Sequence, residues 1–184
     1  IDILNPRTAT REIPAGIISP NAALAFVIIC SIIFILTTWF INPLCFYLSP
    51  IALAITLGYS YTKRFSGICH FVLGLGLALA PIGAFLAVTG EFHLVPVLYS
   101  GAVLFWVGGF DIIYALQDEA FDRKNNLFSV PVYLGREKAL MLSKFSHFLS
   151  AGFMISASFM VKNLYPQMQF LQWGGLVVFL GLLI

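Results

Sequence analysis

Charged residues are scarce in this sequence: Asp, Glu, Lys and Arg make up 10% of its 184 residues, against about 25% in an ordinary soluble domain. So few charges exclude an ordinary soluble enzyme and a disordered tail. Cysteine is scarce as well, and Cys30, Cys45 and Cys69 show no CxxC spacing. This excludes a disulfide-stapled secreted module and a cysteine metal site, and we expect three small buried side chains instead.

Hydrophobic residues, by contrast, make up 60% of the chain and gather in long runs. Five complete runs and a shorter last one can be marked: 21–41, 43–62, 68–90, 94–117, 140–161 and 170–184. Each complete run has about 20 residues or more, which is enough for a helix to cross ~30 Å of hydrocarbon. The sequence therefore predicts an all-α integral membrane protein, with residues 1–184 in one membrane-embedded helical bundle.

The two ends of the sequence suggest missing material. Residue 1 is Ile rather than Met, and the last apolar run stops at Ile184 before it reaches spanning length. We therefore expect the chain to be a fragment that is incomplete at both ends.

The basic residues are distributed unevenly between the two sides of the membrane. If every run crosses, one side receives nine of them and the other side receives only Lys162. The nine are Arg7, Arg11, Lys63, Arg64, Arg123, Lys124, Arg136, Lys138 and Lys144. The positive-inside rule places this side in the cytoplasm. Most acidic residues lie there too, which is unlike a channel with polar groups along its whole length.

Three aspartates recur at helical spacing in the segment Asp111-Ile-Ile-Tyr-Ala-Leu-Gln-Asp118-Glu-Ala-Phe-Asp122. At roughly 100° per residue, one continuous helix would carry all three carboxylates in a stripe that starts inside the membrane. Like charges one turn apart destabilise a helix unless a cation neutralises them, and Mg²⁺ prefers carboxylate and phosphate oxygens. We therefore expect a magnesium site at Asp118 and Asp122. Alternatively, Asp118, Glu119 and Asp122 cap a cytoplasmic loop and pair with Arg123 and Lys124, but Asp111, at membrane depth, has no such role.

Several polar residues allow more than one interpretation. Arg7 and Arg11 lie in a loop beside Asp2, where guanidinium groups suit phosphate oxygens, although membrane topology alone also explains them. Tyr59 and Lys63 are four residues apart and are able to face one pocket, although an interfacial Tyr beside basic residues usually anchors a span.

The histidines and glycines of the apolar runs favour structural roles. His70, His93 and His147 lie at span ends without ligand spacing and are interpreted as interface residues. Gly108 and Gly109 are expected to let helices approach closely, although room for a ligand would also explain them.

Taken together, these residues resemble the UbiA-type intramembrane aromatic prenyltransferases. The segment from Asp111 to Asp122 matches the family's second aspartate motif, DxxYAxxDxxxD, at every defined position, and Tyr59 to Lys63 matches its YxxxK motif. Asp2, followed by the two arginines, looks like the end of the first motif, NDxxDxxxD. Members have about nine spanning helices, so the resemblance implies that about six are present here.

The resemblance implies a role for each of these residues. Mg²⁺ would be held by Asp2, Asp118 and Asp122. The diphosphate of the prenyl donor would be bound by Arg7, Arg11, Tyr59, Lys63 and Lys124. Asp111 and Tyr114 would act on the aromatic acceptor.

The implied activity is the Mg²⁺-dependent transfer of a polyprenyl group from polyprenyl diphosphate to an aromatic acid, first of all 4-hydroxybenzoate, in ubiquinone or menaquinone biosynthesis. The enzyme would sit in the cell's inner (cytoplasmic) membrane with its active site facing the cytoplasm, in contact with lipid and with no nucleic-acid partner. Glu12 replaces a proline common in the family, which resembles a menaquinone-linked subgroup and makes a futalosine-route intermediate the second candidate acceptor.

Two functions of a different kind are also compatible with the sequence. One is a transporter in which Asp111 serves as the proton or cation site. The second is a catalytically silent scaffold in a quinone-synthesis complex. Against transport, the charges gather on one face of the membrane, and the sequence shows no inverted repeat.

Overall fold

The described part of the chain is built from helices and turns. The computed structural model describes residues 2–164 and 166–182, and none of them lies in a β-strand. These residues divide into two compact units, Ile1–Pro50 and Ile51–Ile184. Four helices, named below as α1 to α4, are long and apolar enough to cross a membrane. The predicted all-α membrane fold is therefore confirmed.

The first unit contains a short 3₁₀ turn, η1 (Asp2–Leu4), the helix α1 (Pro20–Ile41) and the start of α2 (Pro43–Thr62). Ser19 caps α1, because its Oγ accepts a hydrogen bond from the Ala22 N–H at 3.2 Å and satisfies a free helix-end donor. Asn42 does the same for α2, where its Oδ1 accepts from the Cys45 N–H at 2.8 Å. The division between the units falls inside α2 at Pro50, a residue that cannot donate a helical hydrogen bond.

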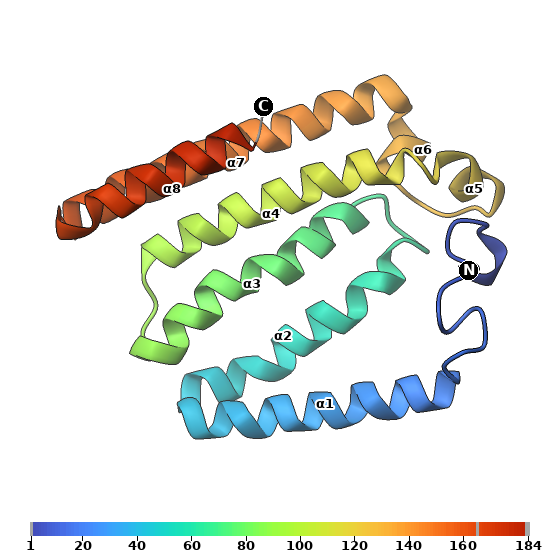
Figure 1. The fold of residues 1–184 in the computed structure, drawn as a ribbon, viewed down its shortest axis with the longest axis horizontal. Coiled ribbons are helices and arrows are strands. Elements are labelled where there is room, and N and C mark those ends of the chain that lie inside the picture. The colour runs from blue at the N-terminus through green and yellow to red at the C-terminus, as the bar shows by residue number, and fades with distance from the viewer. Residues whose placement is uncertain (1, 165, 183–184) are drawn as a thin grey trace. The chain divides into compact units, whose positions relative to one another are not determined.

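The second unit is a layer of long helices with α4 (Leu94–Ala115) at its centre. Figure 1 shows α4 between α3 (Cys69–Thr89) and α7 (Arg136–Leu164), and α8 (Gln169–Gly181) lies along α7. Two short helices, α5 (Glu119–Lys124) and α6 (Val130–Leu134), join α4 to α7. A second short 3₁₀ turn, η2 (Pro166–Met168), precedes α8.

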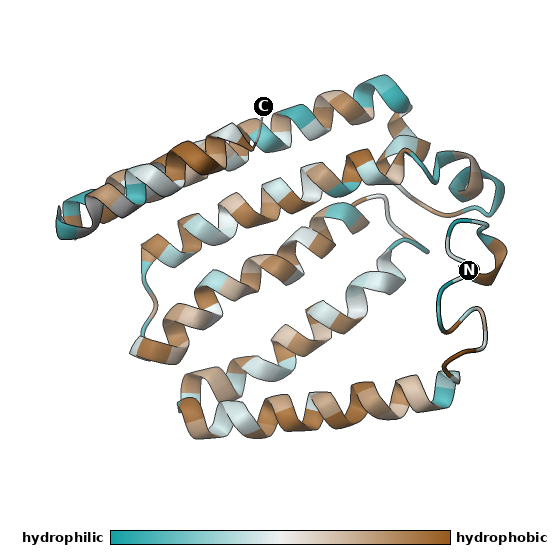
Figure 2. Cartoon of the chain, in the orientation of Figure 1, coloured by the Kyte–Doolittle hydropathy of each residue, from teal (hydrophilic) through white to brown (hydrophobic). Residues whose placement is uncertain are grey.

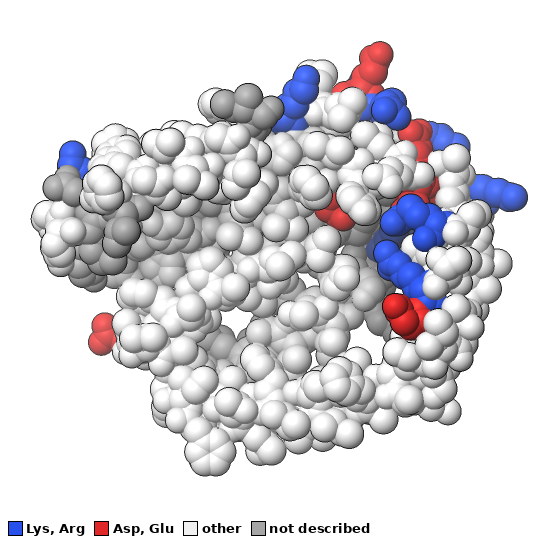
Figure 3. All heavy atoms as spheres, in the orientation of Figure 1, with Lys and Arg blue, Asp and Glu red and all other residues white. Residues whose placement is uncertain are grey.

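Polar and charged residues of this unit gather where α3 and α7 begin and α4 ends. Figure 2 shows hydrophilic colour at that end and apolar colour along α3 and α4, and Figure 3 shows charged side chains over α5 and the start of α7. We call this end of the second unit the charged end.

Small residues let α4 pack closely against both of its neighbours. A Cβ atom on Gly108 would lie 2.8 Å from Cδ1 of Phe71 on α3, and one on Gly109 would lie 3.1 Å from Cβ of Ser146 on α7. The hydroxyls of Ser143 and Ser150 on α7 donate to the carbonyl oxygens of Gly109 and Ala102, both at 2.7 Å. Small residues and interhelical hydrogen bonds are the usual means of helix association in lipid. The packing role predicted for the two glycines is therefore confirmed.

The predicted apolar runs coincide with helices, with some corrections at their ends. The run 94–117 ends as a helix at Ala115, and the run 140–161 belongs to a longer helix, α7, of 29 residues. The last run forms α8 up to Gly181, and residues 183–184 lie outside the described residues. That the whole chain forms one membrane-embedded domain stays a prediction.

The cysteines correct another expectation. Cys69 is buried as expected, but Cys45 is only half-buried and Cys30 is exposed on α1. All three are free thiols, so the prediction of three buried side chains is wrong for Cys30.

We predict that Gly74→Ala destabilises the fold by roughly 1–3 kcal/mol, because a Cβ there would overlap the Leu104 carbonyl oxygen of α4. The matched control is Gly83→Ala on the same helix, where a Cβ meets no described atom within 4 Å. At that position Ala removes a helical glycine penalty of roughly 1 kcal/mol. Thermal unfolding in detergent should therefore show a lower midpoint for the first variant only, and equal shifts would contradict the packing.

Candidate active site

The ion pair between Lys63 and Asp122 lies at the charged end. Lys63 follows α2 directly and Asp122 lies on α5, and Lys63 Nζ lies 2.8 Å from Asp122 Oδ2. The carboxylate is fully buried at 0% exposure, whereas the lysine side chain is 32% exposed. A buried carboxylate is costly unless it is paired, so Asp122 depends on this cation. The sequence placed Asp122 in the metal site and Lys63 in the diphosphate site, and the structure brings them together.

The backbone around this pair is held by hydrogen bonds between distant parts of the chain. The Phe128 N–H donates to the Lys63 carbonyl at 2.8 Å, and the Leu127 N–H donates to the Asp122 carbonyl at 2.9 Å. The Cys69 thiol donates to the Phe128 carbonyl at 3.6 Å. The loop between α5 and α6 is thereby fixed against the residues that precede and begin α3.

The helix that carries Asp111 does not continue to Asp122. α4 ends at Ala115, and Asp118 is the residue that precedes the first turn of α5. The prediction of a single helical stripe through Asp111, Asp118 and Asp122 is therefore wrong. The last two aspartates do lie one helical turn apart, because the Asp122 N–H donates to the Asp118 carbonyl at 2.8 Å. The break turns them away from the regular course of α4.

Asp111 instead has a partner on the neighbouring helix. Its Oδ2 lies 2.7 Å from Nδ1 of His70, a residue of α3 that is only 2% exposed. His70 Nε2 in turn lies 3.2 Å from the backbone N–H of Val130, at the start of α6. From the sequence, His70 was predicted to be an ordinary interface residue, and this contact was not predicted. One signal in the sequence could have indicated the contact. His70 lies near the start of one apolar run and Asp111 near the end of the next, so both lie at the same end of two consecutive antiparallel segments.

A largely apolar cavity of about 600 Å³ opens beside Asp111. Its two polar lining residues are Asp111 on α4 and His147 on α7. Its apolar lining comes from α3, α4 and the residue after α8, through Leu73, Trp106, Val107, Phe110, Ile113 and Leu182. A carboxylate in an apolar cavity is an arrangement in which a bound ring can be oriented by one polar contact.

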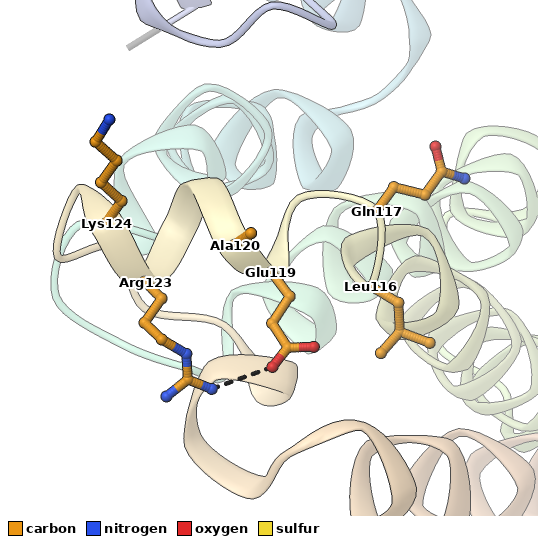
Figure 4. Close-up of a pocket in the computed structure, with 6 residues that line it drawn as sticks. All are labelled: Leu116, Gln117, Glu119, Ala120, Arg123 and Lys124. Atoms are coloured by element: carbon orange, nitrogen blue, oxygen red, sulfur yellow. Dashed lines mark hydrogen bonds and ion pairs between the residues drawn. The ribbon is translucent and has the colours of Figure 1, made fainter.

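A second cavity, of about 540 Å³, lies on the surface at the junction of α4 and α5 (Figure 4). There Glu119 and Arg123 point toward one another, and Arg123 Nη2 donates to Glu119 Oε1 at 3.1 Å. The loop-capping interpretation is therefore right for Glu119, but Asp122 pairs with Lys63 instead. Lys124 lines the same cavity and is exposed.

The remaining candidate residues occupy varied positions. Tyr59 on α2 is 38% exposed and Tyr114 on α4 is 48% exposed. Asp2 lies in the first unit, where its Oδ1 accepts a hydrogen bond from Thr8 Oγ1 at 3.3 Å. Arg7 and Arg11 are exposed residues of that same unit.

The donor set at Asp118 and Asp122 fits a hard divalent cation. Both carboxylates are buried, and Asp122 Oδ1 has no hydrogen-bond partner among the described residues. Among those residues no three His, Cys, Asp or Glu side chains form a metal-binding group. Mg²⁺ is nevertheless commonly held by one or two carboxylates together with substrate phosphate oxygens, and two buried aspartates one helical turn apart provide such carboxylates.

Comparisons with known proteins place the chain in a family. The UbiA prenyltransferase family matches the chain over residues 1–184. A protein of Saccharophagus degradans named 4-hydroxybenzoate octaprenyltransferase is 27% identical over 97% of this chain and 69% of its own length. One of the same name from Albidiferax ferrireducens is 35% identical over 71% of this chain and 44% of its own length.

A solved structure adds evidence from the fold. The apo structure of a UbiA homologue from Aeropyrum pernix K1 superposes with a TM-score of 0.80 at 34% identity, over 90% of this chain. The chain spans 62% of the length of that protein. The helices, the aspartate motif and these matches define a membrane-embedded prenyltransferase class. The chain belongs to the UbiA prenyltransferase family, an enzyme family, as its motifs predicted.

We predict that Lys63→Met destabilises the protein by roughly 1–3 kcal/mol, since it leaves the buried Asp122 carboxylate without its cation. The double variant Lys63→Met/Asp122→Asn should recover most of that loss. The exposed Glu119–Arg123 pair is the control, and Arg123→Met should cost under about 0.5 kcal/mol. A double-mutant cycle from denaturant or thermal unfolding measures both, and equal costs at the two pairs would contradict the assignment.

Proposed function

We propose that the whole protein transfers a polyprenyl group from polyprenyl diphosphate to the ring of an aromatic acid in quinone biosynthesis. The observation that carries this proposal is the buried Asp122 carboxylate, which is paired with Lys63 on one oxygen and lacks a described hydrogen-bond partner on the other. Such a carboxylate is suited to a cation that arrives with a phosphorylated substrate. The names of the relatives from Saccharophagus degradans and Albidiferax ferrireducens support 4-hydroxybenzoate as the first acceptor to test.

The reaction is a substitution on an aromatic ring. The bond between the allylic carbon of the prenyl chain and the diphosphate oxygen breaks, and diphosphate leaves with the bonding electrons. A carbon–carbon bond forms between that allylic carbon and a ring carbon, which loses its proton. The products are the prenylated ring, diphosphate and one proton, so no oxidant or reductant is needed.

At the charged end, Lys63 is the candidate group for binding the diphosphate. The ammonium group of Lys63 is part exposed and fixed beside Asp122, where it stabilises negative charge as the leaving group departs. Arg7, Arg11, Tyr59 and Lys124 are the further candidates for this role, and for them the proposal rests on the motifs. Arginine suits this task because its planar fork matches phosphate oxygens.

Two carboxylates would hold the metal. Asp118 and Asp122 would bind Mg²⁺, which when bound neutralises charge on the diphosphate as a Lewis acid. Asp2 would contribute to a second such ion, a role that rests on the motif alone. Asp122 is held for this task by Lys63 and by the backbone bond from Leu127.

Asp111 is the candidate group for the acceptor. Its carboxylate lines the 600 Å³ cavity, where it is placed to accept a hydrogen bond or a proton from a ring hydroxyl. Tyr114, one helical turn later on α4, is the second candidate. The apolar lining of the cavity excludes water, which protects a reactive allylic cation from hydrolysis.

The distribution of charge supports an orientation in the membrane. In the second unit, seven basic residues lie at or near the charged end and Lys162 lies at the opposite end of α7. The seven are Lys63, Arg64, Arg123, Lys124, Arg136, Lys138 and Lys144. By the positive-inside rule, the charged end faces the cytoplasm in the cell's inner membrane. Substrates made in the cytoplasm would then reach the site directly.

We predict that the purified whole protein, given Mg²⁺, labelled polyprenyl diphosphate and 4-hydroxybenzoate, forms a prenylated product that EDTA abolishes. Asp122→Ala and Asp118→Ala should each lower kcat by on the order of 100-fold or more, because negative charge on the leaving group then goes unstabilised. Glu119→Ala is the matched control, since Glu119 lies between them and pairs only with Arg123 among the described contacts. It should keep nearly full activity.

The acceptor is tested in the same assay with a panel of aromatic acids. Product with a menaquinone-pathway acid but none with 4-hydroxybenzoate would keep the chemistry and change the substrate. If the intact protein releases no diphosphate with any acceptor, the proposed enzyme activity is wrong, and a transporter or a scaffold becomes the better hypothesis.

A further inference from the structure

The hydrogen bonds of His70 fix which ring nitrogen carries its proton. The Val130 backbone N–H can only donate, so His70 Nε2, 3.2 Å away, must accept and carries no proton. The proton is therefore on Nδ1, which donates to Asp111 Oδ2 at 2.7 Å. This pattern of donor and acceptor positions fits the neutral Nδ1–H tautomer at a residue that is 2% exposed.

We propose that His70 is a positioning residue for the acceptor, acting through Asp111. Its Nδ1–H holds Oδ2 of the Asp111 carboxylate and leaves Oδ1 for the acceptor hydroxyl. This inference rests on the proposed function, because it assigns Asp111 to the acceptor. It goes further by adding a histidine outside the aspartate and YxxxK motifs to the reaction.

The position of Asp111 on its helix explains why such a partner is needed. Asp111 is 34% exposed at its side chain and lines a cavity that is otherwise mostly apolar. A free carboxylate there would rotate between rotamers, and a bound ring would meet it in several orientations. A ligand-binding group is positioned well when a second residue locks its rotamer. His70 is itself fixed on both sides, by Asp111 and by Val130.

The same histidine links the acceptor cavity to the diphosphate groups. Val130 begins α6, directly after the loop in which Phe128 binds the Lys63 carbonyl and Leu127 binds the Asp122 carbonyl. The neighbouring Cys69 thiol also binds this loop, at the Phe128 carbonyl. His70 therefore sets the distance between Asp111 and the Lys63–Asp122 pair. A reaction between two bound substrates depends on such a fixed spacing, because small displacements cost much of the rate.

The tautomer is tested first, since it needs no activity. Nitrogen-15 NMR of the whole protein with labelled histidine reports which ring nitrogen is protonated, and the His70 signal is assigned by its loss in His70→Asn. We expect the neutral Nδ1–H form at His70. The Nε2–H form, or a ring protonated on both nitrogens, would break the bond from Val130 and overturn the proposal.

Kinetics test the positioning role. His70→Leu should lower kcat/KM for the aromatic acceptor by about 10- to 100-fold, the range found for residues that orient metal-ligating side chains, and leave KM for the prenyl diphosphate within about twofold. His70→Asn should restore much of this loss, because its amide nitrogen can take the place of Nδ1 as the donor to Asp111. His70→Leu in an Asp111→Asn background should add little, since the histidine acts through that carboxylate.

The matched control is His93, whose Nδ1 accepts from the Val95 N–H and caps α4 at its other end. His93→Asn should leave both substrates' kinetics unchanged. If His70→Leu and His70→Asn instead raise both KM values together and lower the unfolding midpoint equally, His70 is only structural and the proposal fails. If the wild-type protein forms no product with any acceptor, the proposed function is wrong, and so is the positioning role. The Nδ1–H tautomer is tested independently, because NMR measures it without any activity.

Discussion

The close approach of α4 to both of its neighbours is the constraint on which the second unit depends. It is possible because Gly108 and Gly109 present no side chain, so that α3 and α7 contact opposite sides of the same turn. In lipid, moving an apolar helix surface from lipid tails to another helix gives little hydrophobic free energy. Helix association therefore relies on close packing and on interhelical hydrogen bonds such as those from Ser143 and Ser150. The approach also brings His70 within reach of Asp111. The His70–Asp111 contact and the packing of the helices therefore depend on the same few residues.

The charged end follows a second physical rule, that a buried charge needs a partner. Asp122 obtains one from Lys63, which lies 59 positions earlier in the chain, and two backbone hydrogen bonds hold the loop around this pair. Glu119, three positions from Asp122, forms an exposed ion pair with Arg123. Burial therefore makes the energetic roles of these two acidic residues different. The Glu119–Arg123 pair is local and weakly coupled to the fold, whereas the Lys63–Asp122 pair connects the end of α2 to α5 and to the loop before α6.

The sequence predicted the helices better than the contacts between them. Apolar runs located all the long helices to within a few residues, because length and hydropathy are properties of the chain alone. The break after Ala115 was missed, since the DxxYAxxDxxxD spacing fits a continuous helix and the turn at residues 116–118 contains neither Gly nor Pro. The His70–Asp111 contact was missed because it joins residues 41 positions apart, and helix register cannot be read from periodicity. The pairing of Lys63 with Asp122 has the same explanation.

The order of His70 and Asp111 along the chain bears on how this protein enters the bilayer. A lone aspartate in an apolar segment opposes insertion, and Asp111 lies within α4, four residues before its end. His70 lies in the first turn of α3, which is synthesised before α4, so the partner of Asp111 has already left the ribosome when Asp111 emerges. The two antiparallel helices can then leave the insertion machinery as a pair, with the polar group of one already satisfied by the other. The histidine that we propose as the positioning partner of Asp111 in the finished enzyme thus also lowers the cost of bringing that carboxylate into lipid.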